Sequence, residues 1–129
     1  MTDIRFTDLT LSDPLLAALK EMGYEHPTPV QASAIPLAGA GSDLMVQSQT
    51  GTGKTAAFGI PIIERLDVEK GIRAVILCPT RELAKQVAEE VTALGQVKGI
   101  RCAAVYGGAS MNKQIAEMRF AHVVVGTPG

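Results

Sequence analysis

A glycine-rich segment at residues 48–55 constrains the fold more than any other part of this sequence. It reads Ser48-Gln49-Thr50-Gly51-Thr52-Gly53-Lys54-Thr55, with an apolar run before it and a helix-like run after it. Glycines let successive backbone N–H groups turn toward one point, and the N-terminus of a following helix adds partial positive charge. A strand, a glycine loop and a helix in this order are typical of a phosphate-binding loop. We therefore expect a strand at residues 44–47 and a helix at about 53–66.

The end of this segment carries the candidate chemistry. Lys54 would reach the β- and γ-phosphates of a nucleotide, and the Thr55 hydroxyl would hold a Mg²⁺ ion. Ser48 departs from the general pattern, which opens with glycine, although a small residue should still fit there. The alternative is an ordinary glycine-rich turn with a threonine cap. The Gly-Lys-Thr triplet in this context favours the phosphate-binding interpretation.

The rest of the chain divides into a helical part and an alternating part. Residues 1–42 predict two helices, one beginning at Ser12 or Asp13 and one beginning after Thr28, with Pro36 and a glycine turn closing the second. Thr28 and Gln31 have the spacing of a capping box. From residue 43 to 129 strands and helices alternate. Further strands are expected at 73–78, 101–106 and 121–125. Helices are expected at 82–94 and, with Ser110 as its cap, in a short segment that ends at about Met118.

This alternation predicts an α/β fold, a parallel sheet with helices on both faces. Ligands of such sheets gather at the carboxyl ends of the strands. The segments at 49–55, 79–82, 107–108 and 127–129 should therefore lie along one edge. In the helix at 82–94, we expect an apolar face made by Leu83, Val87, Val91 and Leu94.

Composition excludes several classes of protein. Apolar residues make up 47% of the 129 residues, so a core can be buried and disorder is not expected. Twelve basic against 13 acidic residues give a net charge of −1, so no chain-wide basic field indicates nucleic acid, although a local basic surface remains open. We find no signal-peptide pattern and no stretch long enough to cross a membrane, and expect a soluble, cytoplasmic protein. Cys78 and Cys102 lie in predicted strands and are interpreted as small buried apolar residues.

Five segments in order resemble the DEAD-box family of ATP-dependent RNA helicases. They are Gly23-Tyr24-Glu25-His26-Pro27-Thr28-Pro29-Val30-Gln31, the loop at 48–55, Pro79-Thr80-Arg81-Glu82-Leu83-Ala84, Gly107-Gly108 and Thr127-Pro128-Gly129. They resemble the Q motif, motif I, motif Ia, the GG pair and the opening of motif Ib. Phe6 resembles the isolated aromatic upstream of the Q motif. The family usually opens motif I with alanine, where this chain has Ser48.

The resemblance implies a RecA-like fold, ATP and Mg²⁺ as cofactors, and RNA as a partner. Gln31 would hydrogen-bond the adenine edge and Tyr24 would stack on the base, while the loop from Ser48 to Thr55 would hold the phosphates. A second set of residues would lie on the RNA backbone, where contacts carry no sequence information. That set is Thr80, Arg81, Gly108, Thr127 and Gly129.

The residues alone leave other roles open. Gln31 could only complete the capping box, and Tyr24 could be an ordinary half-buried aromatic residue. Arg81 and Glu82 could be a solvated first helical turn, and Gly107-Gly108 only a turn. His26 and His122 lack a partner at metal-ligand spacing and are interpreted as structural.

The resemblance also marks what the sequence lacks. The Asp-Glu-Ala-Asp carboxylate motif, the Ser-Ala-Thr motif and the second RecA-like domain with its arginine finger are absent. We therefore expect one incomplete ATP-binding domain, 1–42 and 43–129 together, that binds ATP or ADP but hydrolyses no ATP alone. Two alternatives stay open: a stand-alone nucleotide- or RNA-binding module, and another phosphate-loop helicase acting on DNA.

Overall fold

The fold was analysed in a computed structural model. It describes residues 4–47, 53–66, 68, 71–108 and 110–128. The chain forms two compact units, Met1–Arg65 and Leu66–Gly129.

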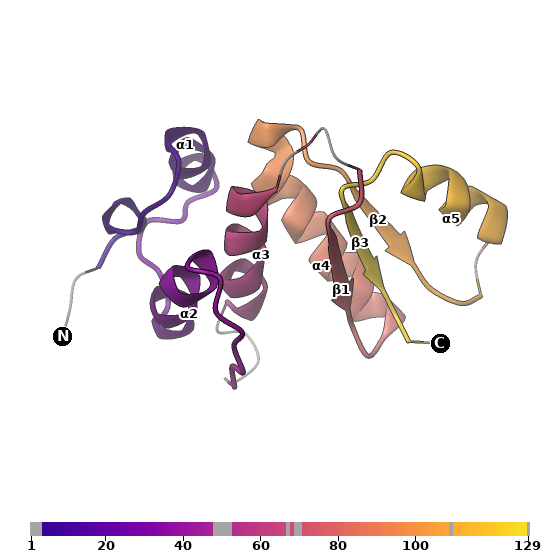
Figure 1. The fold of residues 1–129 in the computed structure, drawn as a ribbon, viewed down its shortest axis with the longest axis horizontal. Helices are drawn as coiled ribbons and strands as arrows, with labels where there is room; N and C mark the ends of the chain where they lie inside the picture. The colour runs from indigo at the N-terminus through magenta and orange to yellow at the C-terminus, as the bar shows by residue number, and fades with distance from the viewer. Residues whose placement is uncertain (1–3, 48–52, 67, 69–70, 109, 129) are drawn as a thin grey trace. The chain divides into compact units, whose positions relative to one another are not determined.

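The first unit is helical. A short 3-10 helix η1 (Phe6–Asp8) precedes α1 (Asp13–Glu21), α2 (Pro29–Gly39) and α3 (Lys54–Arg65), of which α2 and α3 pack against each other (Figure 1). The fully buried side chains of this unit come from α1 and α3 and are Leu15, Leu19, Ile60 and Ile63. The Glu64 carboxylate of α3 accepts hydrogen bonds from the Ser12 backbone N–H and hydroxyl at 2.8 and 3.1 Å. The start of α1 is thereby tied to α3.

The predicted capping box at the start of α2 is confirmed. The Thr28 hydroxyl accepts from the Gln31 N–H at 3.4 Å, and the Gln31 Oε1 accepts from the Thr28 N–H at 2.9 Å. Pro29 occupies the first helical position, where its missing N–H has no helical partner to lose. The end of α2 differs from our expectation, because the helix continues through Pro36 to Gly39. A proline removes a donor and crowds one carbonyl, but the helix ends one turn later, so few bonds are affected.

The strand expected at residues 44–47 is not formed. These residues have no regular secondary structure and are exposed, with Met45 fully so. A strand needs a neighbour to satisfy its backbone N–H and C=O groups, and no described strand lies beside this one. The apolar composition of the run indicated a strand but contained no information about its partner.

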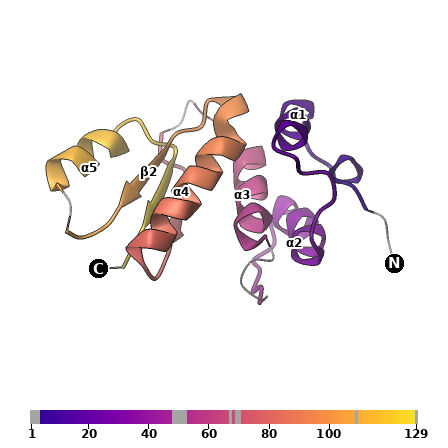
Figure 2. The same ribbon diagram turned by 180° about the vertical axis from the view of Figure 1, so that it is seen from behind.

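The second unit is a three-stranded parallel sheet with helices packed against it. Its elements are β1 (Ala74–Leu77), α4 (Arg81–Gly95), the 3-10 helix η2 (Gln96–Lys98), β2 (Cys102–Val105), α5 (Met111–Met118) and β3 (Val123–Gly126). The strand order is β1-β3-β2, so β3 lies in the centre. The helix α4 runs along one face of the sheet and α5 lies beside β2 (Figures 1 and 2). The α/β prediction is confirmed, with three of the four expected strands.

The core of this unit lies between α4 and the strands. Val123 and Val125 of the central strand are fully buried, as are Val91 and Leu94 of α4. Leu83, expected on the same helix face, is instead 38% exposed, and Ala84 takes its place at 0%. Both residues are apolar, so helical periodicity alone did not separate the first buried position from its neighbour.

The two cysteines behave as the sequence predicted. Both are free thiols; Cys78 is buried and Cys102 half-buried. Burial raises the pKa of both thiols, and for Cys102 a hydrogen bond with Thr92 partly lowers it again. Thiols held in the neutral form are poor nucleophiles, so both are packing residues. Among the described residues, none of the helices is both long and apolar enough to span a membrane.

The His122 side chain connects Arg101, which precedes β2, with Val68, which lies before β1 in the chain. Its Nδ1 accepts a hydrogen bond from the Arg101 backbone N–H at 3.0 Å, and its Nε2 lies 2.8 Å from the Val68 carbonyl oxygen. A ring nitrogen that accepts carries no proton, so Nε2 is the protonated nitrogen and donates to Val68. The sequence prediction that His122 is structural agrees with these contacts.

Replacing His122 with alanine should lower the stability of the chain by about 0.5–1.5 kcal/mol, because two hydrogen bonds are lost but the exposed backbone groups can bond to water instead. Chemical denaturation checks this. His122→Asn is the matched control, since its shorter carboxamide can still accept from Arg101 but cannot reach Val68, and its loss should be intermediate. An alanine variant as stable as the unchanged chain would contradict the structural role.

Candidate functional site

The candidate phosphate site lies in the first unit, where the glycine segment enters α3. Ser48, Gln49, Thr50, Gly51 and Thr52 lie outside the described residues. Gly53 has a φ of +85°, a backbone conformation that residues with a Cβ rarely adopt. A Cβ at Gly53 would collide with Gln31 Nε2 and would lie 3.3 Å from Thr28 Oγ1. The chain therefore needs glycine at this position both for its φ and for its close approach to α2.

Lys54 and Thr55 form the first turn of α3. Lys54 is exposed and Thr55 is half-buried, so both side chains can be reached from solvent. The first N–H groups of a helix have no partner within it, and together with a cation they favour an anion. This donor set, next to a glycine that brings the backbone close to α2, fits a phosphate group. A hydroxyl at Thr55 also fits a hard cation such as Mg²⁺, which prefers oxygen ligands.

Gln31 connects the capping box to this site. Its side chain is only 4% exposed, and its Nε2 donates to the Gly53 carbonyl oxygen at 3.2 Å while Oε1 accepts from Thr28. A carboxamide offers two donor hydrogens and two acceptor lone pairs, so one of each is used within the protein. The cap role that the sequence left open is thus present, and Gln31 also contacts the residue that precedes Lys54.

The two aromatic candidates, Phe6 and Tyr24, lie together in another part of this unit. Their ring centroids are 6.0 Å apart with an interplanar angle of 36°. Phe6 is 3% exposed, whereas Tyr24 is half-buried. Both line a hollow of about 490 Å³ whose lining residues do not include Gln31. The structure thus pairs Phe6 with Tyr24, and among the described residues the hollow that these two line does not include Gln31.

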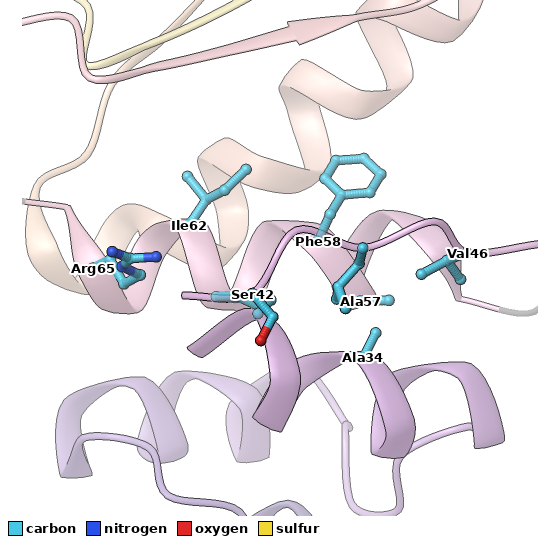
Figure 3. A pocket seen from close by; sticks show the side chains of 10 residues that line it. Ala34, Ser42, Val46, Ala57, Phe58, Ile62 and Arg65 are labelled. Atoms are coloured by element: carbon cyan, nitrogen blue, oxygen red, sulfur yellow. The ribbon is translucent and has the colours of Figure 1, made fainter. Parts of the chain in front are cut away.

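A second hollow in the first unit is largely apolar. It measures about 410 Å³ and lies between α2, α3 and residues 42–46. In Figure 3, Phe58 and Ile62 of α3 lie at the top, Ala34 of α2 lies below them, and Arg65 and Val46 lie at the left and right sides. Few polar groups line it, so it is poorly suited to phosphates. No group of three His, Cys, Asp or Glu side chains that could hold a metal occurs among the described residues.

The candidate RNA residues meet at one edge of the second unit. Because all three strands are parallel, the residues that follow them come out on the same side: Thr80 after β1, Gly108 after β2 and Thr127 after β3. The Thr127 N–H donates to the Val105 carbonyl at 3.1 Å, and a Cβ at Gly108 would lie 3.3 Å from Arg81 Nη1. The expected clustering is therefore present for these residues. Gly129 lies outside the described residues.

Thr80 also has a structural role. Its hydroxyl accepts a hydrogen bond from the Leu83 N–H at 3.2 Å, which caps the start of α4. The hydroxyl proton can still donate to another acceptor. Arg81, next in the chain, is exposed, and its guanidinium carbon lies 4.9 Å from the centroid of the Tyr106 ring.

Three residues at this edge were missed by sequence reasoning. Lys85 lies one helical turn after Arg81, and its ammonium is 5.5 Å from the same Tyr106 ring. Gln114 of α5 is 5% exposed and forms hydrogen bonds with both the N–H and the carbonyl of Tyr106, each at 3.0 Å. The i, i+4 spacing of Arg81 and Lys85 was a readable signal. Nothing in the sequence joined either cation to Tyr106 or Tyr106 to Gln114.

These motifs and this fold match a known family. The family model described as DEAD/DEAH box helicase matches residues 28–129. The chain belongs to the DEAD/DEAH box helicase family. The resemblance stated from five short motifs is thereby confirmed.

Known DEAD-box proteins match nearly the whole chain. The ATP-dependent RNA helicase CshA of Limosilactobacillus reuteri is 51% identical over 98% of the chain, and the DEAD-box ATP-dependent RNA helicase CshA of Bacillus licheniformis is 49% identical over 98%. In both cases the chain spans only 26% of the relative's length.

Solved structures confirm the fold. A DEAD box protein from Methanococcus jannaschii matches with a TM-score of 0.92 at 46% identity, over 97% of this chain and 35% of that one. A hypothetical ATP-dependent RNA helicase from Sulfolobus tokodaii matches with a TM-score of 0.83 at 39% identity, over 92% of this chain and 34% of that one. The chain therefore has the α/β fold of the DEAD-box domains, of which it covers a part.

Proposed function

We propose that this chain is the nucleotide-binding portion of an ATP-dependent RNA helicase. It binds ATP or ADP with Mg²⁺ through Gln31, the 48–55 loop and Thr55, and contacts RNA through the edge formed by Thr80, Arg81, Gly108 and Thr127. Family membership and the names of the relatives support this proposal. The proposal includes Phe6 and Tyr24 as the aromatic residues of the adenine site.

The hydrogen bond from Gln31 to Gly53 is the observation that carries the nucleotide part. It couples a residue suited to reading a base to the residue immediately before Lys54. Gln31 keeps one donor hydrogen and one acceptor lone pair beyond its two contacts within the protein. That pair matches the amine and the adjacent ring nitrogen of adenine, as Asn and Gln do when they read adenine in DNA. Guanine has a carbonyl in place of the amine and would face the acceptor of Gln31 with another acceptor.

Each bound group has a role set by the chain's own residues. Lys54 offsets the charge of the phosphates, and the first N–H groups of α3 hold them in place. Mg²⁺, when bound, neutralises phosphate charge, and the Thr55 hydroxyl would hold it. The sequence contains no Asp-Glu-Ala-Asp motif, and we propose that hydrolysis needs a further part of the helicase, including its second RecA-like domain. We place this helicase in the cytoplasm, where ATP and RNA are both present.

Replacing Gln31 with alanine should reduce the preference for ATP over GTP by about 1–3 kcal/mol, the size of one bidentate base contact. It should also lower stability by about 1 kcal/mol through loss of the cap. Calorimetric titration with each nucleotide, in the presence of Mg²⁺, measures the preference.

Thr28→Val is the matched control for this experiment. It removes the hydroxyl of the capping box but leaves the Gln31 side chain, so it should lower stability and leave the ATP preference unchanged. If the unchanged chain and Gln31→Ala prefer ATP over GTP equally, Gln31 is only a helix cap and does not contact the base.

A further inference from the structure

The Tyr106 ring lies close to two cations of α4, Arg81 and Lys85. Arg81 and Lys85 approach its centroid at 4.9 and 5.5 Å, and both are exposed. Neither forms an ion pair with a carboxylate of the described residues. Two like charges at i and i+4 on a helix repel each other. Contact with the electron-rich face of one ring offsets part of that repulsion and holds both charges together.

The position of Tyr106 is itself fixed. It follows the last residue of β2, where the ladder to β3 has ended, so its backbone has no strand partner in the described sheet. The buried Gln114 side chain supplies both missing bonds, accepting from the Tyr106 N–H and donating to its carbonyl oxygen. The side-chain amide of Gln114 thus makes the two backbone hydrogen bonds that a neighbouring strand would make. These bonds fix the orientation of Tyr106 at the end of β2.

Gly108 completes the surroundings of the first cation. It has a φ of +80°, and a Cβ there would lie 3.3 Å from Arg81 Nη1. Gly108 therefore lets the backbone pass close to the guanidinium, which stays exposed. With the ring already covered by two cations, this surface is better suited to an anionic backbone than to stacking a base on Tyr106.

We propose that Tyr106 is a positioning residue that holds Arg81 and Lys85 together as a two-cation clamp for the phosphodiester backbone of RNA, and that Lys85 is a second phosphate contact. Gln114 positions Tyr106 in turn. The clamp rests on the proposed function, since it assumes that RNA lies along this edge. The clamp adds one phosphate contact, from Lys85, and orients both positive charges. It adds no contact that recognises the RNA sequence.

Binding of a fluorescent single-stranded oligouridylate by the full chain, over a series of KCl concentrations, tests the clamp. Lys85→Ala should weaken binding several-fold and reduce the salt slope by about 0.7, the value for one phosphate contact on a single strand. Tyr106→Leu should weaken binding several-fold, whereas Tyr106→Phe, which keeps the ring, should bind like the unchanged chain. Lys113→Ala, an exposed lysine of α5, is the matched control.

Two further measurements separate positioning from simple folding effects. In proton NMR, ring currents of Tyr106 should shift the side-chain methylene signals of Lys85; the shift should persist in Tyr106→Phe and vanish in Tyr106→Leu. In a double-mutant cycle, Tyr106→Leu should have a smaller effect in the Lys85→Ala background, because the two residues act together. Additive effects, or Lys85→Ala binding like Lys113→Ala, would overturn the clamp.

The outcomes distinguish the clamp from the proposed function. If Arg81→Ala weakens RNA binding while Tyr106→Leu and Lys85→Ala do not, RNA lies at this edge and only the clamp is wrong. If Arg81→Ala has no effect, the RNA part of the proposed function fails, and the clamp fails with it.

Discussion

Replacing Lys54 with alanine should weaken ATP binding by about 10- to 150-fold, the value of one hydrogen bond to a charged group. Lys54 is exposed at the first position of α3, so its ammonium is not engaged in the packing of the first unit. Alanine is the best helix former, so the variant should fold as well as the unchanged chain. The loss should therefore appear in nucleotide affinity and not in stability.

Calorimetric titration with ATP and Mg²⁺, together with a thermal melt, checks this expectation. Lys113→Ala removes an exposed lysine from the first turn of α5 in the other unit and serves as the matched control. It should bind ATP like the unchanged chain. If both alanine variants bind ATP equally well, Lys54 does not contact the phosphates.

Features set by neighbouring residues could be predicted from the sequence. Thr28 and Ser110 were expected to cap helices, and each hydroxyl accepts from the N–H three residues later. The second and third predicted strands were found within one residue of their expected ends. A helix cap or an apolar run depends on residues only a few positions apart, so the local sequence is enough to predict it.

Features that depend on distant partners could not be predicted in the same way. The run at 44–47 has the composition of a strand, but a strand exists only beside another. Leu83 and Ala84 are both apolar, and only the position of the sheet decides which of them is buried. Similarly, α2 passes through Pro36 because tertiary packing against α3 outweighs the loss of one hydrogen bond.

The candidate sites show the same division. Motifs located Gln31 and Arg81, but not the atoms that they contact. Gln31 contacts Gly53, 22 residues later, and Arg81 contacts Tyr106, 25 residues later. The sequence offered a cap and a base contact as alternatives for Gln31. The structure shows the cap together with a hydrogen bond to the Gly53 carbonyl oxygen, and neither alternative included that bond.

Replacing Gly53 with alanine should strongly destabilise the first unit. A non-glycine residue at a φ of +85° is strained by about 1–3 kcal/mol. The new Cβ would also collide with Gln31 Nε2 and crowd Gln31 Cδ at 3.1 Å. Gln31 would have to move, which breaks its bonds to Thr28 and Gly53 and removes about 1 kcal/mol of capping. We therefore expect a large fall in stability together with a loss of ATP affinity.

Chemical denaturation of Gly53→Ala, Gln31→Ala and the double variant separates these two causes. The part of the loss that comes from the collision should disappear when Gln31 is already alanine, whereas the backbone strain should remain. The double variant should therefore be more stable than the sum of the single losses predicts. Gly39→Ala is the matched control, because Gly39 ends α2 and a Cβ there meets nothing within 4 Å. If Gly53→Ala destabilises the chain equally with and without the Gln31 side chain, the close approach of α2 to the start of α3 does not require glycine at position 53. Backbone strain alone would then account for the loss of stability.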